Sequence, residues 1–437
     1  MNLNVGYMRS TETGYGRMSH LLVEAIKKQG VSVSPCSETE DDAGFPMHAD
    51  ALWMGSPSHV RGWWEGQRSH VLTMWEGTAL PGGFRENMHG FDTVIVPSQQ
   101  NLELFSQFHP NVKKVGLGID PNDWHYQDRP EVGTEFRFMC AGQGPRKGID
   151  VAMRAFNTVF GSYVPTANEP IPTLTVKNRT HMKDVKGYRV TEVSGTLDAA
   201  DEIALYGQAH CFLGLARGEG WGMMPFQAIA QGCPTILVDA HGQAEFAHLA
   251  SARIGTTFSK AESFIFGDAG NWWEPNFDEV CESMWDMYVN YEDYLQPAKF
   301  AAAVVADGYT WDHQARELIN AIGGPQALTA PDLTTRKWHE CDIESFRIVT
   351  NRDCVYEING VTHTFKKGVE YYELADIKRM MFEADELDLV CLENPNESGL
   401  LPHQQADSER YKSQHERCYA CGQRYNSDLS VDDDDIQ

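Results

Sequence analysis

Residues 217–235, RGEGWGMMPFQAIAQGCPT, decide how this chain folds. Glu219 lies among glycines, an almost entirely apolar run follows it, and the stretch ends in Gly-Cys-Pro-Thr. Pro225 fits the first turn of a helix, Gly232 fits its C-terminal cap, and Pro234 stops it from continuing. A helix that is apolar on nearly all sides is buried between a sheet and its neighbours. The stretch therefore predicts a tight loop that leads into a buried helix.

Two polar side chains belong to the start of this predicted helix. Glu219 lies in the loop before it, and Gln227 follows eight residues later, in the first or second helical turn. The N-terminus of a helix carries unpaired N–H groups and a partial positive charge, which favour an anion such as a phosphate. We therefore expect an anion-binding site at this position.

Short apolar runs alternate with helical patterns through most of the chain, which is typical of α/β proteins with parallel sheets. The runs fall into two series separated by the polar linker QDRPEVGTE at 127–135. We predict strands at 3–7, 51–55, 70–75, 92–98 and 112–118, and then at 136–142, 173–177, 210–216 and 235–239. The pattern predicts two successive doubly wound units, with ligands at the carboxyl ends of their strands.

The first unit opens with a strand, the loop MRSTETGYG and a helix that ends at Gly30. Gly14 and Gly16 lie where such a loop turns backbone N–H groups toward an anion, although they match no strict dinucleotide fingerprint. The helix has one apolar face at helical spacing, formed by Met18, Leu21, Leu22, Ala25 and Ile26.

The composition excludes several classes of protein. The net charge of −26 argues against tight non-specific binding to nucleic acid or to an anionic membrane. No run of about 18 apolar residues is present, so we expect no membrane span. The N-terminus MNLNVGYM lacks the basic region of a signal peptide. Three of the ten cysteines, Cys140, Cys211 and Cys233, lie in apolar runs, which favours buried reduced thiols and a cytoplasmic protein.

The stretch GEGWGMMPFQAIAQGCPTILVD is similar to the Glu-x7-Glu motif of the retaining family-4 glycosyltransferases, which have the GT-B fold and use nucleotide-sugar donors. Segments similar to other signatures of this family occur along residues 1–322, in the order in which the family has them. The resembling segments are TGYGRMSHLLVEAIKKQG, MWEGTALPGGF, DTVIVPSQQNLELF with VGLGID, GPRKGIDVAMRAF and YTWDHQARELI.

The resemblance implies an α/β fold with two Rossmann-like doubly wound domains (GT-B). The acceptor-side domain would span 1–128 and the donor-binding domain 129–307. A helix at 308–322 would cross back to the first domain, and 323–437 would form a small α+β C-terminal extension with the acidic tail VDDDDIQ. The Asn-Gly pair in INGVTHTF predicts a β-hairpin within this extension.

The resemblance also implies site residues. Glu219 would contact the hydroxyls of the donor sugar, Lys147 would pair with the diphosphate, and Glu76 would face the reacting centre or the acceptor. Gly16 would offer its N–H to the phosphates. The remaining expected contacts to a UDP- or GDP-sugar are Gly14, Arg146, Gly220, Trp221, Gly222 and Gln227. Cations aimed at the diphosphate stabilise the negative charge of the leaving nucleotide, and no metal ion is required.

Two positions depart from the family pattern. Gln227 replaces the second Glu, which would hold the ribose, and Ala141 falls where the family has an Arg, for which Arg146 is the candidate replacement. An amide offers one acceptor and one donor group, whereas a carboxylate accepts from both ribose hydroxyls. These departures leave a catalytically inactive nucleotide-sugar-binding module as an alternative.

The sequence does not identify the acceptor, which could be a sugar or another hydroxylated molecule. One alternative is a hydroxymethylated pyrimidine in DNA, as in phage enzymes that modify their genomes, although the acidity of the chain counts against it. A second alternative concerns the tail, where His415, Cys418 and Cys421 resemble half of a structural zinc site. Two free thiols near the end of the chain are the simpler interpretation.

Overall fold

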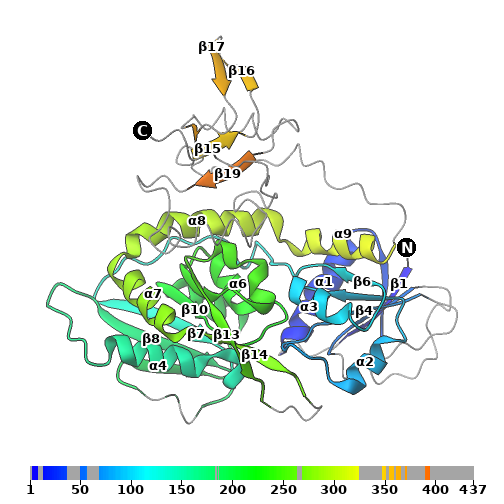
Figure 1. Cartoon of the computed structure of the whole chain (residues 1–437), viewed down its shortest axis with the longest axis horizontal. Helices are drawn as coiled ribbons and strands as arrows, with labels where there is room; N and C mark the ends of the chain where they lie inside the picture. Colours follow the sequence, from blue (N-terminus) through cyan, green and yellow to red (C-terminus); the bar gives the residue numbers. More distant parts are fainter. Residues whose placement is uncertain are drawn as a thin grey trace, which may run out of the picture. The chain divides into compact units, whose positions relative to one another are not determined.

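The computed structural model describes residues 2–7, 13–36, 50–56, 68–182, 185, 187–262 and 268–323, and the backbone of five short strands between 347 and 393. The chain divides into two compact units, Met1–Leu328 and Thr329–Gln437. The first unit contains two six-stranded sheets, one in each of its halves (Figure 1).

The sheet of the first half is entirely parallel, with the strand order β2-β1-β3-β4-β5-β6. Its central strands are buried along almost their whole length, and most of their residues are apolar. The strands are β1 (Asn2–Tyr7), β2 (Ser32–Cys36), β3 (Asp50–Met54), β4 (Ser69–Leu72), β5 (Thr93–Val96) and β6 (Val112–Lys114), and the helices are α1 (Gly14–Lys28), α2 (Gly82–Met88) and α3 (Gln99–Phe105).

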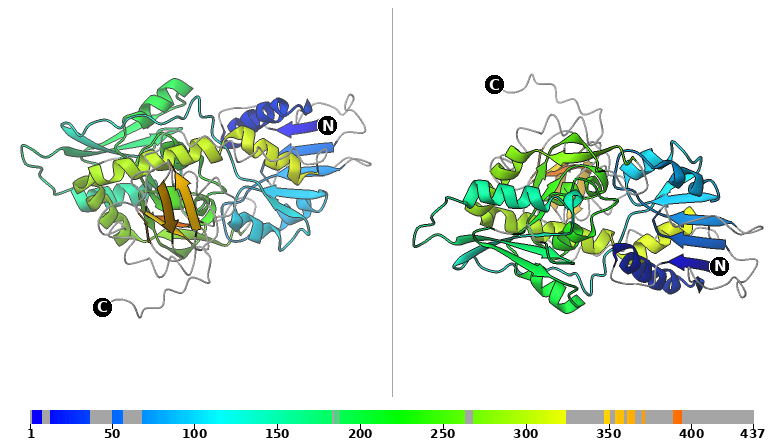
Figure 2. Two further views of the ribbon diagram at one scale, coloured as in Figure 1. Left: turned by 90° about the horizontal axis from the view of Figure 1, so that it is seen from above. Right: turned by 90° about the horizontal axis from the view of Figure 1, so that it is seen from below.

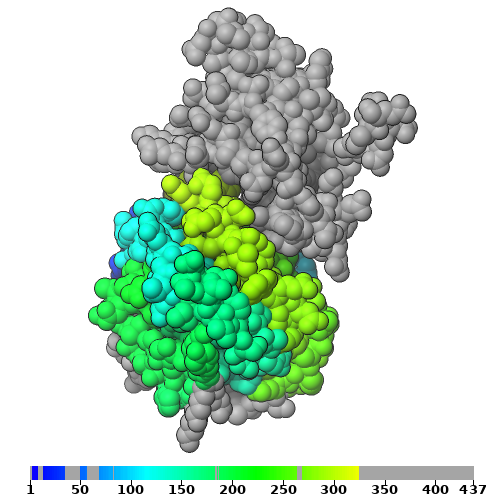
Figure 3. All heavy atoms as spheres, turned by 90° about the vertical axis from the view of Figure 1, so that its left-hand side faces the viewer, coloured from blue at the N-terminus to red at the C-terminus, as the bar shows by residue number. Residues whose placement is uncertain are grey.

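The sheet of the second half is also parallel, with the order β12-β11-β10-β7-β8-β9. Its strands are β7 (Glu135–Ala141), β8 (Ile171–Asn178), β9 (Val190–Ser194), β10 (Cys211–Gly214), β11 (Thr235–Val238) and β12 (Ala252–Ile254). Its helices are α4 (Ile149–Phe160), α5 (Ala199–Gly207), α6 (Met223–Ala230), α7 (Phe277–Val289) and α8 (Tyr291–Gly308). Figure 3 shows this half from the side, coloured from cyan through green to yellow-green. The predicted fold class, two doubly wound α/β units, is confirmed.

The chain returns to the first half in helix α9 (Trp311–Ala321). Figure 2 shows α8 over the second half and α9 beside α1 of the first half. Leu318 and Ile319 of α9 are fully buried in the same apolar core as Leu22 and Ile26 of α1. A bridge between Ile119 and Thr310 fixes the point at which the chain crosses. The two halves are therefore tied together by helix packing as well as by the loops at their junction.

A two-stranded arm, β13 (Thr256–Lys260) and β14 (Asn271–Pro275), belongs to neither large sheet. Trp272 of the arm is 4% exposed and lies in an apolar cluster with Trp75 and Phe84 of the first half. Backbone contacts add to this packing, since the Thr78 N–H donates to the Asn271 carbonyl oxygen at 3.1 Å. The arm thus extends from the second half and is anchored in the first.

The local sequence patterns predicted one buried residue incorrectly and missed several strands. Leu21 was expected on the buried face of α1 but is 36% exposed, and Val23 is buried instead. The sequence analysis missed β2, β9, β12 and both strands of the arm. These strands are short, and β2 and β9 alternate with Ser, Thr or Glu, so their stability comes from neighbouring strands more than from their own residues.

The expectation of buried thiols is confirmed. Cys140, Cys211 and Cys233 are buried free thiols. Within the described ranges, no helix is both long and apolar enough to cross a bilayer. The predicted domain boundaries near 128 and 307 stay predictions.

The second unit contains the strands β15 (Arg347–Thr350), β16 (Cys354–Ile358), β17 (Val361–Phe365), β18 (Glu370–Tyr371) and β19 (Leu389–Glu393). β16 and β17 pair antiparallel with Ile358 opposite Val361, as the Asn-Gly hairpin signal predicts. His415, Cys418 and Cys421 lie outside the described residues, so the zinc alternative stays a prediction.

The packing of α9 on α1 predicts the effect of two matched leucine substitutions. Leu318→Ala empties a fully buried position and should lower the free energy of unfolding by about 2–5 kcal/mol. Leu21→Ala removes the same atoms from a partly exposed position of α1 and should cost less than about 1 kcal/mol. Denaturant titration of both variants measures the difference, and equal losses would contradict this packing.

Candidate functional site

The candidate site lies where the order of the second sheet reverses. β7 and β10 are neighbours, but the chain continues from β7 to β8 on one side and from β10 to β11 on the other. The loops after β7 and β10 therefore diverge from adjacent strand ends. Such switch points are where open α/β sheets bind ligands.

The loop after β7 forms a short basic turn, the 3-10 helix Pro145–Lys147, which presents Arg146 and Lys147. Gly148 ends this turn with φ +66°, and a Cβ atom on it would lie 1.9 Å from the carbonyl oxygen of Leu215. Only glycine fits both the left-handed backbone and the close approach. The sequence RKG thus places two cations directly against the end of β10.

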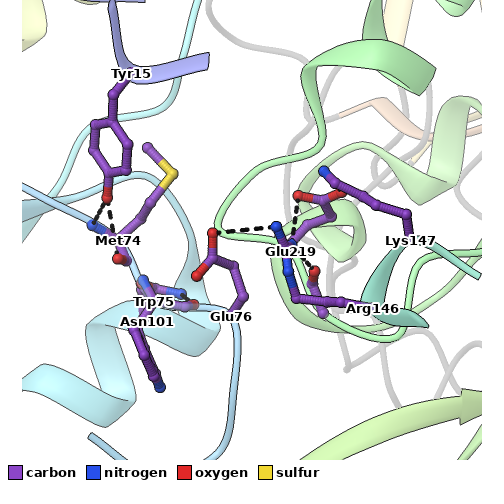
Figure 4. A network of polar contacts seen from close by, with 9 residues as sticks. Tyr15, Met74, Trp75, Glu76, Asn101, Arg146, Lys147 and Glu219 are labelled. Atoms are coloured by element: carbon purple, nitrogen blue, oxygen red, sulfur yellow. Dashed lines mark hydrogen bonds and ion pairs between the residues drawn. The ribbon is translucent and has the colours of Figure 1, made fainter. Parts of the chain in front are cut away.

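Glu219, in the loop after β10, receives hydrogen bonds from both cations (Figure 4). The Nζ atom of Lys147 donates to one carboxylate oxygen, and a guanidinium nitrogen of Arg146 donates to the other at 3.2 Å. Glu219 is 6% exposed. Burial alone would raise the pKa of Glu219, but Lys147 and Arg146 outweigh it and lower the pKa to about 2. Glu219 is therefore an anion at neutral pH.

Arg146 also connects the two halves. Its guanidinium donates to the carbonyl oxygen of Gly218 and lies 3.7 Å from a carboxylate oxygen of Glu76, in the loop after β4 (Figure 4). Burial would lower the pKa of Arg146, yet Glu76 and Glu219 outweigh it and raise that pKa. For Lys147, in contrast, burial outweighs the attraction of Glu219 and lowers the pKa. Two acids and two bases thus form one network, with no net charge when all four are ionised.

The loop that carries Glu76 is held from two sides. The hydroxyl of Tyr15 donates to the Met74 carbonyl oxygen and accepts from the Met74 N–H, both at 3.1 Å. The side chain of Asn101 accepts from the Trp75 N–H at 2.6 Å and donates to the Trp75 carbonyl oxygen at 2.9 Å. Figure 4 shows both pairs on the side of the site opposite Lys147. Glu76 therefore extends from a fixed backbone.

His241 lies behind Glu219. Its Nε2 is 2.8 Å from the carbonyl oxygen of Ala216 and must donate there, while its Nδ1 accepts from the Gln243 N–H at 3.4 Å. Burial lowers the pKa of His241 to about 4, so it is neutral at pH 7. His241 therefore fixes the loop after β11 and adds no charge to the network.

The glycines predicted to bind the donor occupy distinct positions. Gly14 is the exposed first residue of α1, and the Gly16 N–H donates to the Thr13 hydroxyl at 3.0 Å, so an anion at this amide has to compete with that cap. Gly222 caps α6 with φ +107°. A Cβ on Gly220 would lie 2.5 Å from the sulfur of Met74 in the first half.

Trp221 and Gln227, the other two residues predicted to contact the donor, are buried. The ring of Trp221 is 2% exposed and packs against Phe226 and Phe246, so it is part of the core. Gln227 is 9% exposed on α6. Of the predicted set, the structure joins Lys147, Arg146, Glu219 and Glu76 in one network of polar contacts.

The sequence analysis did not single out Arg217, Asp150 or Tyr15. Arg217 directly precedes Gly218 and pairs with Asp150, which follows the RKG turn. The available signal was a charged residue placed immediately after an apolar strand, at the carboxyl edge where side chains reach ligands. Within the described part of the chain, no group of three or more His, Cys, Asp or Glu side chains could hold a metal ion.

The arrangement is suited to an anion, because Arg146 and Lys147 lie next to each other on one short turn. Lys147 and Arg146 already lie at the junction of the two halves, paired with Glu219. An incoming phosphate would take the place of Glu219 as the partner of these two cations. Glu219 would then be released to accept hydrogen bonds from hydroxyl groups.

Comparison with known proteins gives one family and one fold. A family model described as "Family 4 Glycosyltransferase in conflict systems" matches residues 98–318. No curated protein matches the sequence.

Solved structures with low sequence identity share the fold. Sucrose-phosphate synthase (tll1590) from Thermosynechococcus elongatus is 11% identical, with a TM-score of 0.53 over 73% of this chain and 97% of its own. Anabaena Alr3699/HepE in complex with UDP and glucose is 11% identical, with a TM-score of 0.54 over 74% and 99%. The structure described as "Trehalose-6-phosphate from E. coli bound with UDP-2-fluoro glucose" is 10% identical, with a TM-score of 0.55 over 74% and 99%. These likenesses confirm two Rossmann-like domains of the GT-B type.

The basic turn predicts different effects for two glycine substitutions. Gly148→Ala should lower the free energy of unfolding by at least about 3 kcal/mol, because strain at positive φ adds to a collision with Leu215. Gly144→Ala, with φ +82°, ψ 169° and nothing within 4 Å of the new Cβ, adds backbone strain without a collision and should cost about 1–3 kcal/mol. Denaturant titration compares the two, and a Gly148→Ala variant as stable as Gly144→Ala would refute the described turn.

Glu219 predicts a pH-dependent stability. A carboxyl whose pKa falls from 4.5 to about 2 on folding stabilises the native state fully above pH 4.5, and this contribution is lost as the pH falls toward 2. Glu219→Gln should therefore lower the free energy of unfolding by about 3 kcal/mol at neutral pH, and its difference from wild type should shrink at about pH 4. Denaturant titrations at both pH values, with the exposed Glu24→Gln as control, measure this. A difference that does not change with pH would contradict it.

Proposed function

Because the chain belongs to the family-4 glycosyltransferases of conflict systems, we propose that it moves a sugar from a UDP- or GDP-sugar to an acceptor hydroxyl, with retention of configuration and without a metal ion. The observation that carries this proposal is the contact of Lys147 and Arg146 with Glu219 at the switch point of the second sheet. This contact brings two cations that would bind a diphosphate next to a carboxylate that would accept hydrogen bonds from sugar hydroxyls.

Lys147 and Arg146 would bind the donor diphosphate. Cleavage of the bond between the sugar and the phosphate oxygen leaves positive charge on the sugar ring and negative charge on the departing nucleotide. Fixed cations stabilise the negative charge in a junction that excludes much of the water. Arg146 fits this role because Glu76 and Glu219 raise its pKa, so it stays charged throughout.

Glu219 would orient the sugar, and Glu76 would face the acceptor. Once the diphosphate pairs with Lys147, the carboxylate of Glu219 becomes available to the sugar hydroxyls. Both carboxylates hydrogen-bond or pair with the same Arg146, so neither is positioned as an independent covalent nucleophile of the kind that retaining glycosidases use. We therefore infer a same-face displacement, in which the acceptor oxygen bonds to the sugar and its proton passes to the leaving phosphate oxygen.

The donor choice rests on Gln227 and on the known structures. Gln227 lies on α6, where the family's second carboxylate would hold the ribose, and its amide can still accept one hydroxyl and donate to another oxygen. Two of the compared structures hold UDP with glucose or UDP-2-fluoro glucose, so UDP-glucose is the first donor to test.

The replacement of the family's second carboxylate by Gln227 favours one competing function, that of a binding module without turnover. Such a module would bind the nucleotide sugar through the same cations and form no product. Modified DNA remains among the acceptors to be tested, and the net charge of −26 counts against it.

The test is a matrix of UDP- and GDP-sugars against acceptors, with product identified by mass spectrometry and nucleotide binding measured by calorimetry. The acceptors include simple sugars and duplex DNA with and without hydroxymethylated pyrimidines. We expect transfer by the wild type and an activity loss of about 100–1,000-fold in Lys147→Ala and in Glu219→Gln.

A matched pair of controls uses Lys27→Ala and Glu24→Gln, which break an exposed ion pair on α1 and should leave activity unchanged. Nucleotide binding without product from any donor would favour the non-catalytic module. Neither binding nor product would overturn the proposal.

A further inference from the structure

We propose that Arg217 is a positioning residue. It couples the packing of the arm (β13 and β14) against the first half to the geometry of the basic turn at Pro145–Lys147. In this arrangement, Arg146 and Lys147 take the positions in which they meet an anion only while the arm is anchored. The biochemical consequence rests on the proposed function, whereas the coupling itself is a property of the protein without ligand.

Arg217 first fixes the basic turn. Its guanidinium donates to both carboxylate oxygens of Asp150 at 2.7 Å, and Asp150 lies in the first turn of α4, directly after the turn. The same guanidinium donates to the carbonyl oxygen of Pro145, and the Arg217 N–H donates to the carbonyl oxygen of Arg146 at 2.7 Å. Two carbonyls of the turn and the start of the following helix are thus held by one residue.

Arg217 also fixes the arm. Its Nε donates to one carboxylate oxygen of Glu274 in β14, and a terminal nitrogen donates to the other at 2.9 Å. The Arg217 carbonyl oxygen accepts from the Trp273 N–H at 2.9 Å. An arginine side chain has five N–H donors, and the bonds to Asp150, Glu274 and Pro145 use all five.

The arm in turn contacts the loop that carries Glu76. Trp272, two residues before Glu274, is buried with Trp75 of the first half. The Asn271 N–H donates to the Thr78 hydroxyl at 2.7 Å, and the Thr78 N–H donates to the Asn271 carbonyl oxygen. A continuous path therefore leads from the loop after β4, through the arm and Arg217, to the basic turn.

This path has the features of a coupling rather than of general packing. Arg217 is 8% exposed, so loss of one carboxylate leaves a buried guanidinium with unmatched donors. Asp150 in α4 and Glu274 in β14 are joined through Arg217, whose guanidinium hydrogen-bonds to both carboxylates. A planar fork has one geometry that satisfies both carboxylates, so a shift of β14 must move either Arg217 or the turn.

The decisive experiment measures hydrogen–deuterium exchange in the full-length protein without ligand. The N–H groups of Lys147 and Gly148 donate to Gly144 and Pro145 within the turn, so their exchange reports its order. Glu274→Gln removes the charge on the arm side without touching the turn. We expect it to raise exchange at Lys147 and Gly148 by about 10-fold, which corresponds to about 1.4 kcal/mol of lost local stability.

The matched control is Asp50→Asn, which breaks a comparable bidentate pair with Arg68 at the amino end of the first sheet. It should leave exchange at Lys147 and Gly148 unchanged. Equal exchange at these two amides in wild type and Glu274→Gln would overturn the coupling, whatever the protein binds. Arg217→Lys keeps the charge but loses the fork, so it should behave like Glu274→Gln rather than like wild type.

Kinetics separate a positioning role from simple loss of folded protein. Because the donor itself orders the turn on binding, Glu274→Gln should raise KM for the donor by about 10-fold and leave kcat within about twofold of wild type. A fall in kcat at unchanged KM would indicate loss of active protein and would contradict the positioning role. A wild type that neither binds nucleotide nor forms product would refute the proposed function, and the exchange experiment would still decide the coupling.

Discussion

The structure depends on a buried charge network that spans the junction of the two halves. Arg146 lies between Glu219 of the second half and Glu76 of the first, and Lys147 completes the balance. Charges taken out of water are tolerated only when each has a partner, so the network constrains every segment that brings a partner to it. Gly148, with φ +66°, and Gly218, where a Cβ atom would lie 2.1 Å from the carbonyl oxygen of Glu76, allow these segments to approach one another.

The same network explains how an acidic protein can handle an anionic ligand. The chain carries a net charge of −26, yet the four charges at the junction cancel. The local field, rather than the overall charge, decides what a site attracts or repels, and the balanced charges keep this site from repelling an anion as the rest of the chain would. When an anion takes over the cations, two carboxylates are left to neighbouring hydroxyl groups, which suits a substrate that carries phosphate at one end and sugar at the other.

Much of this arrangement could be read from the sequence because it is encoded locally. The buried helix α6 follows from the apolar run between Gly222 and Gly232, and the basic turn follows from RKG after an apolar strand. The resemblance to the glycosyltransferase family then brought Lys147 and Glu219 into one site. What could not be read depends on distant contacts. The arm is stabilised by Trp272 in the other half, and the two bidentate partners of Arg217 lie 67 and 57 residues away from it.

The packing of α9 on α1 has a consequence for biosynthesis. The apolar face of α1, which includes Leu22 and Ile26, is covered by residues near position 318. During translation, the first sheet emerges from the ribosome long before the helix that covers it, so this face stays open to solvent until nearly all of the catalytic unit has been made. The half that is synthesised first is therefore the half that finishes folding last, and until then it is the part of the nascent chain most in need of a chaperone.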